Sequence, residues 1–285
     1  MIYLTISDNS IEAIQTKKDL FGKEKIVATS QKNLTDGMVV KGIVSDVDKF
    51  QAQLEELFTT AYPKIIDDTD ICVGISDKQV LTYRFITEKS SSKENISEKV
   101  LHEAKKHIPY DPTELENFYK ILPADKGDTT EVLYTAMTQN TIMHFKSFFQ
   151  KLGGKLKFLS STSFGIYELV KHLIPKGNKI LYVMVEEKTW EYYVLDENGP
   201  ILTLDIKIGE KDKHEVLKGI IDQLKEKHAI TISQVILAGK ASIEVNAHQI
   251  EELIHTPISK MGDLAENIYK NIKMEIDTGG QPRFL

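Results

Sequence analysis

The sequence predicts an α/β protein in which one arrangement occurs twice, giving two five-stranded mixed sheets with helices. Three strand patterns and a helix pattern follow one another from residue 2 to residue 59, and the same succession returns from residue 179 to residue 228. Each copy continues into a further strand and helix. Between the copies, residues 77–139 combine strands with one helix, which indicates a small α+β insertion subdomain in the first domain.

The elements of the first copy follow from the spacing of apolar residues. Polar and apolar residues alternate in three strands, and a run of apolar and β-branched residues indicates an interior strand. A helix is predicted where apolar residues recur every three to four positions behind a capping Ser45 or Asp46. The predicted elements are strands Ile2–Ile6, Ile11–Thr16 and Lys25–Ser30, helix Asp46–Thr59 and strand Thr69–Ile75.

The insertion contains an amphipathic helix between strands. Its apolar residues share one side, and Asn95 with Glu98 three residues later is a capping pattern. Pro109 disfavours helical geometry at Ile108, so we expect the helix to end there. The predicted elements are strand Val80–Ile86, a helix running to Ile108, and strands Leu115–Leu122 and Glu131–Met137.

The second copy begins after a break at Pro175–Asn178, so we expect domains at residues 1–174 and 175–285. Before the break, a helix ends at Gly153-Gly154, a common left-handed stop. The predicted elements around the break are helix Ile142–Leu152, strand Leu156–Leu159, helix Ser163–Leu173, strands Lys179–Val185, Glu191–Leu195 and Ile201–Ile208, helix Asp212–His228, strand Gln234–Ala238 and helix Val245–His255.

Composition excludes several classes of function. The formal charge is -6, from 36 basic and 42 acidic side chains, which argues against a general nucleic-acid binder. Cys72 is the only cysteine, so a reducing compartment fits. We find no signal-peptide pattern and no window near the roughly 20 apolar residues of a membrane helix. We therefore expect a cytoplasmic protein without direct membrane insertion, held at the inner face of the membrane by partners.

The sequence offers no recognisable catalytic or metal-binding motif. The eight histidines show no HExxH or paired Cys/His spacing, and no GxSxG, Walker or GxGxxG pattern occurs. Asp67, Asp68 and Asp70 lack the ligand spacing of a calcium loop and read as a polar turn before a strand. No catalytic residue and no metal ligand is therefore predicted.

Two segments of the insertion resemble a known family. Residues Val100–Tyr110, VLHEAKKHIPY, and the later Phe118–Leu122 are similar to PilM, the cytoplasmic actin-like protein of type IV pilus assembly. That family has a helix ending in a Glu-Ala-x-Lys-x-Ile-Pro-Phe-like sequence, followed by a similar strand. Weaker similarity extends across nearly the whole chain. The resemblance implies a duplicated actin-like (ribonuclease H-like) fold.

The sequence departs from the family at the nucleotide loops. Actin-like sites use two Asp-x-Gly turns whose glycines let backbone N–H groups approach the phosphates. Neither turn is present here, an acidic residue replaces a lysine of the first loop, and one helix stands where a lid subdomain is expected. The degenerate positions are Thr5, Ser7, Glu12, Met184, Glu186, Gly239 and Lys240. We expect no cofactor and no enzymatic activity; a divergent ATPase that binds ATP and Mg is the alternative.

The resemblance also implies a function for the insertion. In the family, a groove between the first domain and its insertion binds the N-terminal peptide of a PilN-like bitopic membrane protein. The residues expected to bind the partner are Tyr83, Phe85, Glu103, Ile108, Pro109, Tyr110, Phe118 and Tyr119. Ordinary subdomain core is the competing interpretation of each. The pilus motor ATPase is a further candidate partner, and the cytoplasmic domain of a type II secretion L-like protein is a further candidate identity.

Overall fold

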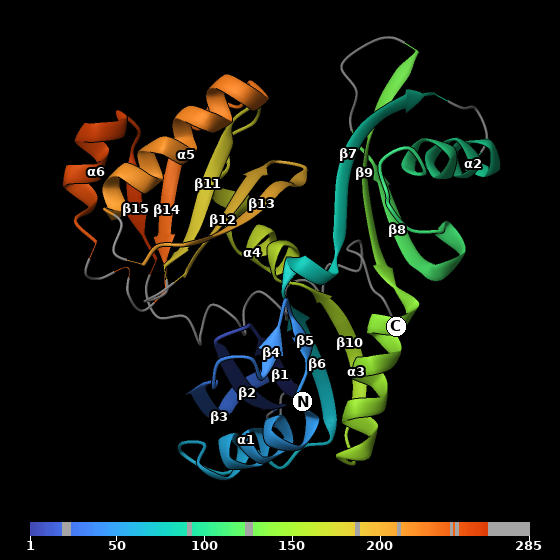
Figure 1. The fold of residues 1–285 in the computed structure, drawn as a ribbon, viewed down its shortest axis with the longest axis vertical. Helices are drawn as coiled ribbons and strands as arrows, with labels where there is room; N and C mark the ends of the chain where they lie inside the picture. Colours follow the sequence, from blue (N-terminus) through green and yellow to red (C-terminus); the bar gives the residue numbers. More distant parts are fainter. Residues whose placement is uncertain are drawn as a thin grey trace. The chain divides into compact units, whose positions relative to one another are not determined.

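The computed structural model describes residues 1–18, 24–89, 93–122, 128–185, 189–209, 212–239, 242 and 245–261. The chain divides into two compact units, the first from Met1 to Gly165 and the second beginning at Ile166. Each unit contains a five-stranded mixed sheet, which confirms the predicted duplication (Figure 1). A three-stranded sheet of the first unit belongs to the predicted insertion.

The first sheet has the strand order β10-β6-β1-β2-β3. β1, β2 and β3 are antiparallel neighbours, whereas β6 is parallel to both β1 and β10. Helices α1 and α3 share one apolar core with this sheet, in which Leu4 and Val73 meet Phe50 of α1 and Phe145 of α3. The elements are β1 Ile2–Ile6, β2 Ser10–Lys18, β3 Glu24–Asn33, α1 Val47–Thr59, β6 Asp70–Ile75, α3 Gln139–Lys151 and β10 Lys155–Ser161.

The second sheet repeats this order as β13-β12-β11-β14-β15. Its last strand is absent from the elements that apolar spacing predicts, because three residues are too few to show a pattern. It lies parallel to β14, as β10 lies parallel to β6. The elements are α4 Thr162–Val170, β11 Lys179–Val185, β12 Thr189–Asp196, β13 Gly199–Lys207, α5 Lys213–His228, β14 Gln234–Ala238, α6 Ala247–Ile254 and β15 Ile258–Lys260.

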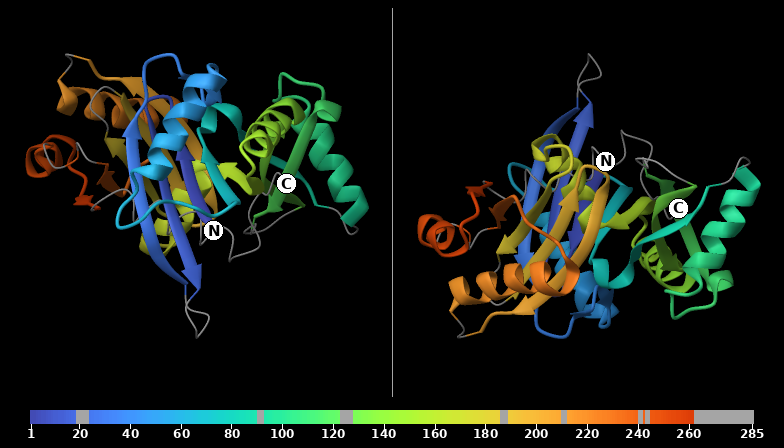
Figure 2. Two further views of the ribbon diagram at one scale, coloured as in Figure 1. Left: turned by 90° about the horizontal axis from the view of Figure 1, so that it is seen from below. Right: turned by 90° about the horizontal axis from the view of Figure 1, so that it is seen from above.

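The insertion consists of an antiparallel sheet, ordered β7-β9-β8, with α2 against one face. It can be followed as the green and teal part of Figure 2. Val100 and Ala104 of α2 pack on Phe85, Val132 and Tyr134 of the sheet. The elements are β7 Leu81–Glu88, α2 Lys93–Ala104, β8 Leu115–Ile121 and β9 Thr129–Thr138.

Two expectations for local structure are wrong, and one element was not expected. The helix α2 ends at Ala104 rather than Ile108, because the backbone tightens there: Lys106 N–H bonds Glu103 O and His107 N–H bonds Ala104 O. Asn95 does not cap the helix, since the backbone is already helical at Lys93. The short hairpin of β4 (Val39–Val40) and β5 (Ile43–Val44) was not predicted, because its strands are two residues each.

Candidate functional site

Ser7 closes the turn between β1 and β2 with its own side chain. Its hydroxyl oxygen accepts hydrogen bonds from the backbone N–H groups of Asn9 at 3.3 Å and Ser10 at 2.9 Å. The Ser7 N–H donates to the Ser10 carbonyl at 2.9 Å. A phosphate loop presents backbone N–H groups of this kind to its ligand. In this turn those donors already have partners.

Asp8 ties the same turn to two other segments. Its carboxylate accepts a hydrogen bond from the Gly42 N–H at 2.7 Å and lies 3.0 Å from the Lys78 ammonium. Both charged side chains are only 27% exposed. Gly42 has φ +79°, and a Cβ there would stand 2.9 Å from the Ser76 Cβ, so the hairpin packs closely against the chain after β6. Lys78 is therefore held by the protein's own carboxylate beside this turn.

The root of the insertion is held by Gln79, which lies between β6 and β7. Its side-chain amide donates to the Lys41 carbonyl at 2.6 Å. Its amide oxygen accepts a hydrogen bond from the Thr141 hydroxyl at 3.1 Å. Thr141 lies in the first turn of α3, directly after β9. Gln79 thus joins the segment that enters the insertion to the segment that leaves it.

Thr5 and Glu12 are cross-strand partners, and Glu12 is in turn paired with Gln31 of β3. Glu12 is 3% exposed, and the Gln31 side-chain amide donates to its carboxylate. An acidic side chain at the position of the expected lysine supplies no positive charge to pair with a phosphate. This part of the sheet disfavours an anion.

The second predicted nucleotide region is also closed by backbone packing. Met184 is 8% exposed and paired with Glu191 in the β11–β12 hairpin. Gly239 has φ +91°, and a Cβ there would stand 2.6 Å from the Val185 carbonyl oxygen. The glycine is therefore required by close approach of two strand ends. Glu186 and Lys240 lie outside the described residues.

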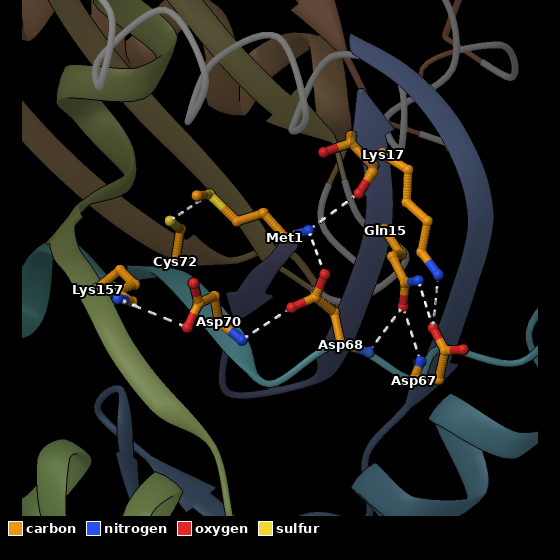
Figure 3. Close-up of polar contacts among 9 residues, drawn as sticks. Met1, Gln15, Lys17, Asp67, Asp68, Asp70, Cys72 and Lys157 are labelled. Atoms are coloured by element: carbon orange, nitrogen blue, oxygen red, sulfur yellow. Dashed lines mark hydrogen bonds and ion pairs between the residues drawn. The ribbon is translucent and has the colours of Figure 1, made fainter. Parts of the chain in front are cut away.

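The aspartates before β6 contact protein groups (Figure 3). Asp67 accepts a hydrogen bond from the Gln15 amide at 2.7 Å, and the Gln15 oxygen accepts the Asp67 N–H at 2.7 Å. Asp68 lies 2.7 Å from the Met1 ammonium. Within the described part of the chain, no cluster of three or more His, Cys, Asp or Glu side chains is arranged to hold a metal ion.

The residues predicted to bind a partner lie on different surfaces of the insertion. Four belong to the core between α2 and the sheet: Tyr83, Phe85, Ile108 and Tyr119. Phe118 faces the other side of the sheet, because successive residues of a strand alternate. Pro109 and Tyr110 are exposed in the turn after α2, and Glu103 lies on α2 itself. The structure does not bring all eight together.

His107 completes the edge of the insertion core, a role that the sequence did not indicate. Its ring stacks on Phe85 with centroids 5.8 Å apart and planes at 13°. It also lies 6.1 Å from the Tyr83 ring. The tight turn after Ala104 allows the stacking of His107 on Phe85. This turn stands in place of the last helical turn that the apolar spacing predicted.

An open groove of about 540 Å³ lies between α2 and the end of β7. Glu103 is the predicted partner-binding residue on its wall. The lining residues are Ile86, Thr87, Glu88, Glu98, Lys99, His102, Glu103, Lys106 and Thr129. The sequence carried no signal for this groove, because a single apolar residue such as Ile86 is often exposed on protein surfaces.

The walls of this groove carry fixed ion pairs. Lys99 lies 2.9 Å from Glu88, and Lys106 lies 2.6 Å from Glu103. Hydrogen bonds from these lysines lower the pKa of Glu88 and the pKa of Glu103. Ile86 is 65% exposed between them. The groove therefore combines one apolar contact with alternating charges.

The groove also borders the edge of a sheet. In the described part of the chain β7 pairs with β9 alone, so its other edge has backbone groups without a strand partner. An extended peptide can add to such an edge through main-chain hydrogen bonds. The arrangement suits the binding of a peptide better than chemistry on a small substrate.

No protein-family model and no curated protein matches the sequence. Solved structures do match. A chain of a PilM–PilN type IV pilus biogenesis complex superimposes with a TM-score of 0.73 and 13% identity, covering 99% of this chain and 98% of that one. The cytoplasmic domain of EpsL, an inner-membrane component of the type II secretion system of Vibrio cholerae, gives a TM-score of 0.51 and 10% identity, covering 98% and 94%.

Two sheets with the same strand order, in the fold that these structures share, give this chain a duplicated actin-like fold. Its fold is that of the PilM–PilN structure along nearly the full length of both chains, the insertion included. Among the described helices, none is long and apolar enough to cross a bilayer.

Proposed function

We propose that this protein is a PilM-like scaffold of a type IV pilus or related secretion machine, at the cytoplasmic face of the inner membrane. It docks the N-terminal peptide of a PilN-like bitopic membrane protein on its insertion. The observation that carries this proposal is the similarity in fold to the PilM–PilN structure, with 99% of this chain covered. The pilus motor ATPase remains a proposed second partner.

The docking surface that we propose is the groove between α2 and the end of β7. The exposed edge of β7 supplies main-chain groups, and Ile86 supplies an apolar contact. Glu98 is exposed on the α2 wall, where it favours a basic residue in the bound peptide. Four of the residues expected to bind the partner support the groove indirectly, because they pack α2 against the sheet. They are Tyr83, Phe85, Ile108 and Tyr119.

A direct test is titration of a fluorescent synthetic peptide with the N-terminal cytoplasmic sequence of a PilN-like bitopic protein from the same organism. Ile86→Asp should weaken binding at least about tenfold, because it places a charge on the apolar contact. Ile121→Asp is a matched control: Ile121 is 46% exposed on β8, at the other edge of the same sheet.

The outcomes distinguish failure of the proposed docking surface from failure of the scaffold proposal. Unchanged peptide affinity in both variants would contradict the groove as the docking surface. Loss in Ile121→Asp alone moves the surface to β8, whereas a wild-type chain that binds no peptide contradicts the scaffold proposal itself.

We also propose that the chain binds no nucleotide. The hydrogen bonds of Ser7, the buried carboxylate of Glu12 and the packing of Gly239 support this. Titration with a fluorescent ATP analogue and magnesium should give no saturable binding. Saturable binding that ATP competes away would instead favour the divergent ATPase.

A second candidate is the cytoplasmic part of a type II secretion L-like protein, favoured by the similarity to EpsL over 98% of this chain. Such a protein carries a membrane helix. Recovery of the native protein in the membrane after carbonate washing would favour it, and release by carbonate would favour the PilM-like scaffold.

A further inference from the structure

The outer edge of β8 is open in the insertion sheet. β8 is the last strand in the order β7-β9-β8, and among the described strands it pairs with β9 alone. The Leu122 N–H, directly after the strand, donates to the Glu131 carbonyl of β9 at 2.9 Å. Backbone groups alternate in direction along a strand, so the odd-numbered residues from Leu115 to Ile121 direct theirs to the open edge.

The side chains of β8 are accessible to a partner. Ile121 is 46% exposed, Phe118 is half-buried, and Glu116 and Asn117 are exposed. Within the described part of the chain, no ion pair is found for Glu116 or for Lys120. An open strand edge is a template for a further strand, and here its side chains supply both apolar and charged contacts.

The sequence of β8, LENFYKI, is complementary to itself about Phe118. Glu116 and Lys120 lie two residues on either side of Phe118 and carry opposite charges. Leu115 and Ile121 lie three residues on either side and are both aliphatic. When two β8 strands run antiparallel about a two-fold axis at Phe118, each Glu116 stands opposite Lys120 of the second copy, and each Leu115 stands opposite Ile121 of the second copy.

An axis at Phe118 suits the side chains better than an axis at either neighbouring residue. With the axis at Asn117, Glu116 stands opposite Phe118 of the second copy, and with the axis at Tyr119, Lys120 does. The axis at Phe118 instead brings the two rings together and pairs the opposite charges. It also places Asn117 opposite Tyr119, and both residues direct their backbone groups to the open edge, so the two strands can exchange main-chain hydrogen bonds.

We propose that the open edge of β8 pairs with the same edge of a second copy of this chain. The insertion sheets of the two copies then form one continuous antiparallel sheet. The occupant is a second copy rather than another protein, because β8 itself carries both members of each charge pair and of each aliphatic pair. A two-fold contact of this kind closes on itself, so association stops at the dimer.

This contact is separate from the proposed peptide docking. The peptide is proposed to bind at β7, which is the opposite edge of the same sheet, so the dimer leaves that edge open. Under the proposed docking, one dimer carries two peptide sites. Two sites on one particle strengthen its attachment to partners held in one membrane, through effective concentration.

The first test is analytical ultracentrifugation of the full chain over a concentration series. The wild type should show a monomer–dimer equilibrium. Glu116→Lys and Lys120→Glu should each weaken dimerisation at least about tenfold, because each places like charges opposite one another twice in the dimer. An equimolar mixture of the two variants should dimerise like the wild type, since every charge then meets its opposite. Lys146→Glu, at an exposed position of α3, is the control for charge reversal.

The second test examines the register. Phe118→Cys should form a disulfide-linked dimer on mild oxidation, because opposite residues of a non-hydrogen-bonded antiparallel pair have Cα atoms about 4.5 Å apart. Glu116→Cys should form none, since the two copies of this position lie roughly 14 Å apart along the strands. The native Cys72 is buried and does not compete for the oxidant.

Three results would overturn the proposal. They are a wild type that stays monomeric at every concentration, a dimer that neither charge reversal weakens, and a dimer that Glu116→Cys links while Phe118→Cys does not. Ile86→Asp on β7 should leave dimerisation unchanged while it weakens peptide binding. The dimer and the peptide docking can therefore fail separately.

Discussion

Gly239 lies with its backbone against that of Val185, so that a Cβ on Gly239 would stand 2.6 Å from the Val185 carbonyl oxygen and 3.0 Å from its nitrogen. In the family that the sequence resembles, a Gly-rich nucleotide loop is expected at this position. The packing gives Gly239 a structural role that needs no ligand, because glycine lets the backbones at the ends of β14 and β11 approach each other.

Gly239→Ala should therefore destabilise the second unit. The φ of +91° and the contact with Val185 together should lower the free energy of unfolding by about 1–3 kcal/mol. Urea denaturation followed by tryptophan fluorescence measures it, since Trp190 lies in this unit's core. Gly219→Ala is the control: Gly219 is exposed in α5 with open space around it, so alanine should add about 0.5–1 kcal/mol.

Asp8→Ala should lower the free energy of unfolding by about 2 kcal/mol, because it leaves the Gly42 N–H and the Lys78 ammonium without their acceptor. Asp8→Asn keeps an oxygen for Gly42 and loses only the charge. Partly exposed ion pairs contribute little, so this variant should lose less than about 1 kcal/mol. Equal losses in the two variants, measured by urea denaturation, would contradict the importance of the Gly42 hydrogen bond.

Asp68 should make stability depend on acid pH. Burial alone raises the pKa of this carboxyl, but hydrogen bonds from the Met1 ammonium and the Asp70 N–H outweigh burial and lower the pKa below 3.8. Folding therefore favours the charged form. The stabilisation is complete above the unfolded pKa and is lost as pH falls through the lower folded pKa.

Asp68→Asn should accordingly be less stable than the wild type near neutral pH, and the difference should shrink in acid. Urea denaturation at a series of pH values from about 6 to about 3 measures it. Asp36→Asn, at an exposed position, serves as control. A constant difference at all pH values would mean that Asp68 does not titrate differently in the two states.

Tyr134→Phe should stabilise the insertion. Among the residues that the structure describes, the buried Tyr134 hydroxyl has no hydrogen-bond partner, and burial raises its pKa. Removing such a group should add about 1 kcal/mol to the free energy of unfolding. Tyr119→Phe is the counterpart in the paired strand: its hydroxyl lies 2.5 Å from the Ser97 hydroxyl, so this variant should lose stability. A loss in both variants would contradict the unsatisfied state of Tyr134.

Apolar periodicity predicted most of the fold because long elements repeat their signal. The strands Ile2–Ile6, Lys179–Val185 and Gln234–Ala238 coincide with the predicted ranges. Short elements such as Ile258–Lys260 were not predicted, because this strand is defined by its pairing with β14. Pairing of this kind is a tertiary contact, and three residues carry no sequence pattern that predicts it.

The candidate site was harder to predict, because its side chains depend on strand register. The aromatic residues Phe118 and Tyr119 look equivalent in sequence, yet register places only Tyr119 beneath α2. The groove wall formed by Ile86 and Lys99 depends on how β7 meets α2, which no local pattern specifies. Glu103 lines the groove, and its role in binding a partner stays a prediction.

Gln79 and Thr141 join the two chain segments that connect the insertion to the rest of the first unit. Both connections between the insertion and the sheet beneath it pass this point, one before β7 and one after β9. A second contact joins Leu122 and Leu133 of the insertion to Phe164 of α4. Under the proposed docking, a pull by the membrane-anchored partner on the bound peptide would reach the main sheet through this hydrogen bond and this apolar contact, so their strength would limit the force that the insertion withstands.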